Sequence, residues 1–253
     1  MDKNLTNNSL QSEHTNLIRG GTGYPYVPFE LKLQFHGQVS NPYTVSVKED
    51  YESSAEIISI PYTEQNWTNA GSYIFTVPKG ISKIRVALCA GGGGGAGAAT
   101  RSPSQSYTGG AGGNSSFGSY YTVTGGTGGY ANKNGSCSAG KGGTPNGKNG
   151  TTRSNVSGHS STTSGGSGWS LNFNQASGSY GAGGGAVASS YTSWLGGGGS
   201  GGYYSGYFNV KELENITITV GNYGVLGDTN DSRAHGYNGA SGFVLIAYGQ
   251  GIE

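Results

Sequence analysis

A run of glycines in the middle of this chain limits what it can fold into. Residues 91–206 hold 37 of the 51 glycines, open on five consecutive glycines at 91–95 and close on a second near-pure run at 196–202. Glycine loses more conformational freedom on ordering than any other residue, and a segment without apolar side chains has little surface to bury. Composition alone is therefore compatible with a flexible linker.

A period of three within the run favours an ordered alternative. The sequences GGAGGN at 109–114 and GGTGGY at 125–130 place two glycines before each residue that has a side chain. Three residues per turn is the repeat of the extended left-handed polyproline II geometry. Side chains then project once per turn, and the bare backbone at the other two positions packs closely enough for hydrogen bonds between neighbouring segments. We therefore predict a bundle of polyglycine II helices joined by turns.

The sequences that flank the run have the patterns of β-strands. Apolar residues alternate with polar or small ones over 73–77, 84–88 and 216–220, and 243–248 is a continuous apolar run typical of a central strand. Two strands thus lead into the glycine run and two lead out. We expect them to pair with one another, which clamps the ends of the run and offsets part of the entropy of ordering it.

Composition and charge exclude several classes of protein. Charged residues make up 11% and hydrophobic residues 33%, so a conventional core must be small and confined to the ends. The five basic residues of 91–206 are too dispersed for a nucleic-acid groove, although they favour an anionic surface. Cys89 and Cys137 form neither a disulfide framework nor a metal-binding pattern. We expect no cofactor, no metal, no nucleic acid, no secretory signal and no membrane insertion.

The chain upstream of the flanking strands has a different composition. Residues 1–23 are rich in Asn, Ser and Thr, and we expect an arm that orders only against a partner. Alternation over 29–35 predicts the first strand of a small antiparallel sheet. The predicted fold class is all-β plus polyglycine II, a small antiparallel β frame with an inserted bundle of polyglycine II helices. Its parts are an arm at 1–23, a β attachment domain at 24–62, a β frame made of 63–90 and 207–253, and the glycine-rich insertion at 91–206.

Five sequence features occur in a fixed order. They are Trp67, the strand and turn GSYIFTVPKG at 71–80, a strand that runs into polyglycine over 84–95, the sequence ITVG at 218–221, and a final strand over 239–246. This order resembles that of the glycine-rich domain of phage tail-fibre and related virion adhesin proteins. The resemblance covers about residues 63–250, and residues 1–61 do not match. It implies a sandwich of polyglycine helices whose loops bind a receptor.

The resemblance implies that receptor-binding residues lie in the turns of the glycine-rich segment. Tyrosine beside Ser, Gly and Asn is also the composition of antibody loops. The candidates are the aromatic and basic residues that interrupt the glycines: Tyr107, Tyr120, Tyr121, Tyr130, Lys141, Lys148, Arg153, Trp169, Tyr180, Tyr191, Trp194, Tyr203 and Tyr204. The alternative is that about half of the aromatic residues cover the ends of the bundle and its junction with the sheet. We expect residues 135–164 to form the exposed tip.

Enzyme motifs in the chain are explained by its composition. GxGxxG at 92–97 and GxSxG at 198–202 both lack the helix that a nucleotide site or a nucleophile elbow needs. Glycan hydrolysis ordinarily needs two carboxyl groups, and the glycine-rich segment has none. Asp228 and Asp231 are interpreted as part of a polar turn, with weak calcium binding left open. We expect no catalytic residues.

These expectations combine into a non-enzymatic receptor-binding protein of a phage tail fibre or tail tip. Its partners would be a glycan or outer-surface protein of the host cell and, through residues 1–62, other virion tail proteins; homo-oligomerisation is left open. Such a protein acts outside the cell as part of the virion. The alternative is a structural subunit of an extracellular or virion filament, in which the arm at 1–23 inserts into the next copy by strand addition. An ice-binding protein would need a flat face of regularly spaced Thr or Ala, which is absent.

Overall fold

The structure is a computed structural model that describes residues 60–102, 105–156, 161–189, 192–227 and 233–252. These residues contain no helix, and their strands form small antiparallel sheets, so the all-β class is confirmed for the described part of the chain. They belong to one compact unit, residues 57–253. The predicted arm at 1–23 and all but the last three residues of the predicted attachment domain lie outside the described residues.

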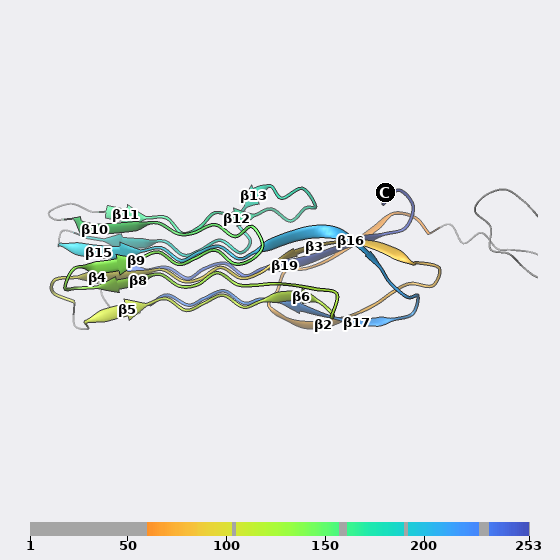
Figure 1. The fold of residues 1–253 in the computed structure, drawn as a ribbon, viewed down its shortest axis with the longest axis horizontal. Coiled ribbons are helices and arrows are strands. Elements are labelled where there is room, and N and C mark those ends of the chain that lie inside the picture. Colours follow the sequence, from red (N-terminus) through yellow and green to blue (C-terminus); the bar gives the residue numbers. More distant parts are fainter. Residues whose placement is uncertain (1–59, 103–104, 157–160, 190–191, 228–232, 253) are drawn as a thin grey trace, which may run out of the picture. The chain divides into compact units, whose positions relative to one another are not determined.

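Two four-stranded sheets form what we call the frame (Figure 1). The first contains, in order, β1 (Thr63–Trp67), β19 (Phe243–Tyr248), β3 (Lys83–Cys89) and β16 (Tyr203–Asn209). The second contains β2 (Gly71–Thr76), β17 (Asn215–Val220), β6 (Ser115–Phe117) and β7 (Tyr121–Val123). The pairs β3–β19 and β2–β17 confirm that strands on the two sides of the glycine run pair with one another.

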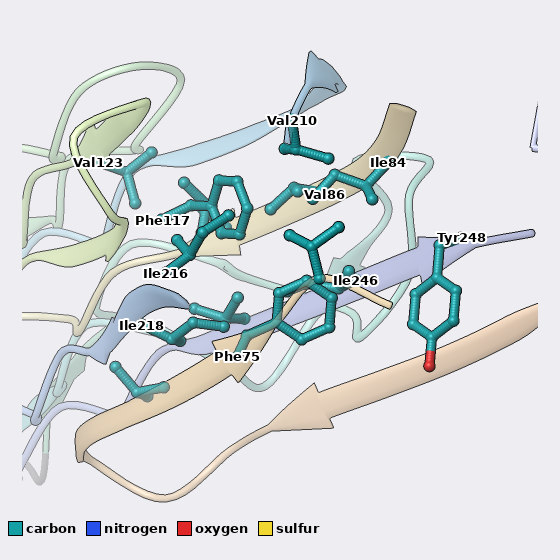
Figure 2. Close-up of a cluster of buried hydrophobic side chains, with 14 of the residues drawn as sticks. Phe75, Ile84, Val86, Phe117, Val123, Val210, Ile216, Ile218, Ile246 and Tyr248 are labelled. Atoms are coloured by element: carbon teal, nitrogen blue, oxygen red, sulfur yellow. The ribbon is translucent and has the colours of Figure 1, made fainter. Parts of the chain in front are cut away.

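The two sheets of the frame meet in one apolar core (Figure 2). Because successive side chains of a strand point to opposite faces, Ile84 and Val86 of β3 enter this core and Arg85 between them lies on the outer face. Phe75 of β2 enters it from the second sheet. Phe117 of β6 is also fully buried there, although its three-residue strand lies inside the glycine-rich segment.

The other strands are short and most lie at the opposite end from the frame (Figure 1). These distal strands are β4 (Ala96–Ala99), β5 (Ser106–Thr108), β8 (Tyr130–Asn132), β9 (Ser136–Ser138), β10 (Thr152–Val156), β11 (Ser161–Thr163), β14 (Ala186–Ala188), β15 (Ser193–Gly196) and β18 (Ala234–Gly236). They pair as three sheets in the orders β10-β15-β4, β11-β14-β18 and β5-β8-β9. β12 (Gly168–Trp169) pairs with β13 (Ser177–Gly178).

Between the frame and the distal strands, glycine-rich segments run side by side (Figure 1). Segment 90–95 shows how they contact one another, since its backbone N–H groups donate in rotation to three neighbours. Residues 90 and 93 donate to segment 197–202, residues 91 and 94 to segment 109–114, and residues 92 and 95 to segment 237–242. Its carbonyls accept from three further segments, 124–129, 181–185 and 221–227. Hydrogen bonds therefore recur every third residue, whereas those of a pleated strand alternate between two sides.

Segment 197–202 is surrounded in the same way. Its N–H groups donate to segments 124–129, 147–151 and 181–185, and its carbonyls accept from 90–95, 139–144 and 164–167. These neighbours, shared in part with segment 90–95, assemble into three layers that we call the glycine array. The outer layers are 109–114, 124–129 and 139–144 on one side and 237–242, 181–185 and 164–167 on the other; the middle layer is 221–227, 90–95, 197–202 and 147–151.

Position in the glycine array explains the two glycine patterns of the sequence. The near-pure glycine segments, 91–95 and 196–202, are buried along their whole length, because the surrounding backbone leaves no room for a side chain. The Gly-Gly-X pattern occurs in the outer layers, where the third residue is exposed, as Ala111, Thr127 and Lys141 are. The number of glycines in each three residues thus reports how many sides of a segment are covered.

Ser200 is the exception within the central run. It is fully buried, and its hydroxyl oxygen accepts a hydrogen bond from the backbone N–H of Lys148 at 2.8 Å. The Ser200 N–H in turn donates to the carbonyl of Lys148. The serine is accommodated because its hydroxyl takes the place of a backbone acceptor.

The predicted boundaries of the glycine-rich insertion, 91–206, match neither the extent of the glycine array nor that of the frame. Segments 221–227 and 237–242 belong to the glycine array, whereas β6 and β7 from inside the insertion complete the frame. Glycines at 221, 224 and 227 and at 236, 239 and 242 carry the signal, one glycine in every three residues. This sparser pattern suffices at the edge of the array, where the residues between the glycines are exposed or half-buried.

The two cysteines are unpaired and differ in burial. Cys89 is fully buried in β3, and Cys137 is half-buried in β9. Desolvation by burial is the main cause that raises the pKa of both thiols above the usual value.

Labelling should distinguish the two thiols. Because the thiolate is the reactive form, iodoacetamide should modify Cys137 alone in the native protein, slowly at neutral pH, with a rate that climbs at higher pH than for a free cysteine. Both thiols should react after unfolding. Peptide mass spectrometry measures this, and Cys137→Ser should abolish native labelling; labelling of Cys89 before Cys137 would contradict the burial described.

Candidate functional site

The connections between glycine segments converge at one end of the molecule's described part. The chain reverses there between β4 and β5, β8 and β9, β10 and β11, β14 and β15, and segment 221–227 and β18. The described residues beside these reversals, together with Arg153 of β10, form what we call the distal surface; they are Thr100, Arg101, Lys133, Asn134, Ser189 and Arg233. Residues far apart in the sequence are thus brought to one surface.

The distal surface is basic. It contains four of the described cationic side chains, whereas the described acidic residues are Glu64, Glu212 and Glu214, all next to or within the frame. Among the described residues, positive charge is therefore concentrated on the distal surface, whereas Asp228 and Asp231, which the sequence places between segment 221–227 and β18, lie outside the described residues.

Hydrogen bonds fix the reversal between β8 and β9. The Asn134 N–H donates to the side-chain oxygen of Asn132 at 2.7 Å, and its amide group donates to Gln105 at 3.0 Å. Lys133 Nζ donates to the carbonyl of Ser102 at 3.2 Å. These bonds tie the β8–β9 reversal to the β4–β5 reversal beside it, so that two connections present their side chains as one unit.

Four of the aromatic residues expected in contact loops are buried. They are Tyr107, Trp169, Trp194 and Tyr203. Trp169 packs against Tyr203 with a ring-centroid separation of 5.2 Å and donates its indole N–H to the carbonyl of Gly201 at 2.9 Å. Burial assigns these side chains to packing, as the alternative interpretation of the aromatics predicts.

Four further aromatic candidates line the frame. Tyr121 and Tyr204 stack at 3.8 Å, and the Tyr120 hydroxyl donates to Glu214 at 2.9 Å. Tyr180 packs edge-on against Phe243 at 5.4 Å. The structure therefore does not bring these four residues to the distal surface.

The remaining candidates divide between the distal end and the side of the array. Tyr130 is half-buried in β8, and Arg153 is exposed in β10, both of which are distal strands. Lys141 and Lys148 are exposed on the glycine array, where Lys148 Nζ lies 5.3 Å from the Trp169 ring centroid. Tyr191 lies outside the described residues.

The prediction that residues 135–164 form one exposed tip is wrong. Described parts of this stretch form β9, the glycine segments 139–144 and 147–151, β10 and β11. Gly-Lys-Gly-Gly at 140–143 continues the glycine array. Sequence analysis did not single out Asn134 and Arg233; the only local signal was the Asn-Lys-Asn-Gly turn that separates two glycine segments.

No metal site or membrane span is found among the described residues. No three His, Cys, Asp or Glu side chains gather in a group that could hold an ion, and no helix there is long and apolar enough to span a bilayer. Asp228 and Asp231, the candidate ion ligands, lie outside the described residues.

Comparison with models of known protein families finds no matching family, and comparison with curated proteins finds no significant match.

Proposed function

We propose that this protein is a non-enzymatic adhesin of a phage tail fibre or tail tip, which binds a glycan or outer-surface protein of the host cell through its distal surface. In this proposal the segments of the glycine array are polyglycine II helices. Residues 1–62 attach the protein to other tail proteins, and the protein acts outside the cell as part of the virion.

The hydrogen-bond period of the glycine array is the observation that carries the proposal. Bonds from segment 90–95 return to the same neighbour every third residue, as three residues per turn require. Each central segment has hydrogen-bonded neighbours on six sides, which satisfies backbone groups that a chain without side chains would otherwise leave unpaired. Such a scaffold is stiff enough to hold loops in fixed relative positions.

Convergence of the reversals on one surface supports recognition. Binding residues are commonly carried on loops that a rigid scaffold positions, as in antibodies. The described distal residues Lys133 and Arg153 provide charged donors for carboxylate or phosphate groups, and Asn134 provides an adaptable amide. Acidic glycans of a cell surface match this chemistry.

A charge-matched pair of double variants tests the proposal. Lys133→Ser with Arg153→Ser should lower binding to host cells by about tenfold or more, because two charge-assisted contacts are lost. Lys79→Ser with Lys211→Ser, two exposed residues of the frame, removes the same net charge and should leave binding unchanged. Flow cytometry of labelled protein on cells measures binding, and circular dichroism melting checks folding.

The outcomes separate specific contact from net charge. Equal losses of cell binding in both double variants would indicate long-range attraction rather than a distal contact. Unchanged cell binding in the distal variant would show that the distal surface is not the binding site. A second test grafts residues 60–252, which include the whole frame and array, onto another tail fibre. Host range should follow the graft, and an unchanged host range would contradict the adhesin proposal.

A further inference from the structure

A groove of about 330 Å³ lies on the outer face of the first frame sheet. Its lining includes Arg85 of β3, Tyr203, Ser205 and Tyr207 of β16, and Phe173 and Gln175 of the excursion between β12 and β13. This volume is at the lower end of the range for small-molecule sites, about 300–1,000 Å³, and suits one or two sugar units. The groove is on the frame and is separate from the distal surface.

Arg85 is the unusual residue of the groove. Its Nε is buried and has no hydrogen-bond partner among the described residues. The guanidinium carbon lies 4.6 Å from the ring centroid of Phe173 and 5.6 Å from that of Tyr207. The two ring faces hold the cation by their quadrupoles but do not accept its N–H. A buried donor without an acceptor costs free energy, and because Nε itself is covered, a ligand in the groove would be bound by the other nitrogens of the guanidinium.

The walls of the groove are held in place before any ligand binds. The Tyr203 hydroxyl donates to the carbonyl of Asn172 at 2.8 Å and accepts from the Gln175 N–H at 3.2 Å. Asn146 donates its side-chain N–H to the Tyr203 carbonyl at 3.3 Å. Burial raises the pKa of Tyr203, so its hydroxyl keeps the proton that it donates. A preorganised site loses less entropy on binding.

The charges around the groove favour an anion. Lys83 Nζ lies 4.9 Å from the Tyr207 ring centroid, on the same ring that Arg85 approaches. No carboxylate of the described residues lines the groove, and Glu64 lies two strands away from Arg85, in register with it through Ala247. A planar guanidinium matches the two oxygens of a carboxylate, which accept its N–H groups as the ring faces do not.

The remaining surface of the groove suits a sugar ring. Tyr207 is 42% exposed and offers an aromatic face for the apolar side of a pyranose. Amide side chains of Asn146, Asn174 and Gln175 and the hydroxyl of Ser205 lie around it as donors and acceptors for sugar hydroxyls. Each component of a carboxylate-bearing sugar therefore has a matching group.

We infer that this groove binds a carboxylate-bearing sugar unit of an acidic surface polysaccharide, with Arg85 on the carboxylate and Tyr207 against the sugar ring. Its biological role rests on the proposed adhesin function, whereas the binding chemistry stands on the groove alone. The groove would then be a second contact with the host surface, on a different face from the distal loops.

Titration of the full chain with sodium glucuronate and with glucose, followed by NMR, tests the inference. Glucuronate should bind in the millimolar range and glucose about tenfold or more weakly. Arg85→Gln should weaken glucuronate binding about tenfold, and Arg85→Lys should recover little of it because an ammonium lacks the planar fork. Lys211→Gln, at an exposed residue outside the groove and the distal surface, is the charge-matched control and should leave glucuronate binding unchanged.

Tyr207→Ala gives a readout independent of Arg85, and its exposed position makes misfolding a minor risk. It should weaken glucuronate binding while Arg85 is intact. Equal binding of glucuronate and glucose, unchanged binding in Arg85→Gln, or equally tight binding of acetate would overturn the inference. A protein that binds host cells but not glucuronate would contradict the groove inference and leave the adhesin proposal standing. A protein that binds glucuronate but not host cells would contradict the adhesin proposal and leave the groove inference standing.

Discussion

Replacement of Gly198 by alanine should lower the free energy of unfolding by more than about 3 kcal/mol. A Cβ at this position would lie 2.1 Å from the carbonyl oxygen of Gly93 and 2.5 Å from its carbonyl carbon. Both residues belong to central segments of the glycine array, so no flexible side chain can move aside. The loss of unfolded-state entropy on replacing glycine by alanine stabilises by only about 0.4–1 kcal/mol, so the clash dominates.

A matched control comes from an outer layer of the array. Ala111 is exposed between two pairs of glycines, and Ala111→Val should change stability by no more than about 0.5 kcal/mol. Urea denaturation followed by circular dichroism and tryptophan fluorescence compares the two variants. Equal tolerance of both substitutions would mean that the central segments are not packed against one another as described.

The Phe117→Ala substitution should cost about 3–5 kcal/mol, as expected for removal of a fully buried phenylalanine. Its ring packs against Tyr120 and Phe208 at centroid separations of 5.4 and 5.7 Å. The loss should exceed that of an exposed residue in the same sheet because a cavity remains in the frame core.

Ile74→Ala is the control for the frame core. Ile74 lies in β2 of the same sheet and is 62% exposed, so its loss should cost less than about 1 kcal/mol. Denaturation of both variants under identical conditions gives the comparison. A Phe117→Ala variant as stable as Ile74→Ala would show that β6 does not complete the frame.

Local sequence patterns predicted much of this fold. Alternation of apolar and polar residues located β2, β3 and β17, because a strand that buries one face needs that period whatever its partners are, and a continuous apolar run located β19. The same patterns bracketed the glycine run and predicted that the strands on its two sides pair with one another, which the pairs β2–β17 and β3–β19 confirm. These features depend on residues close together in the chain, so they can be read locally.

The site was less predictable because burial depends on neighbours. Tyr203 and Tyr130 both follow a pair of glycines, yet Tyr203 is 1% exposed beneath the 172–175 turn and Tyr130 is half-buried at the distal end. Nothing adjacent in sequence distinguishes them. Arg85 likewise looks like an ordinary outward-facing strand residue until Phe173 covers it from far along the chain.

The sequence by itself determined that this chain contains β-strands around a glycine-rich segment. The two-residue period of the strands and the three-residue period of the glycines are each properties of a single segment. Only the tertiary structure decided which segments are central, which aromatic side chains are buried and which reversals share the distal surface. The reason is that a backbone without side chains selects its neighbours through N–H and carbonyl groups, as Gly91 does with Gly113 and Gly92 with Ala240. Every residue carries those groups, so no sequence pattern specifies the partner.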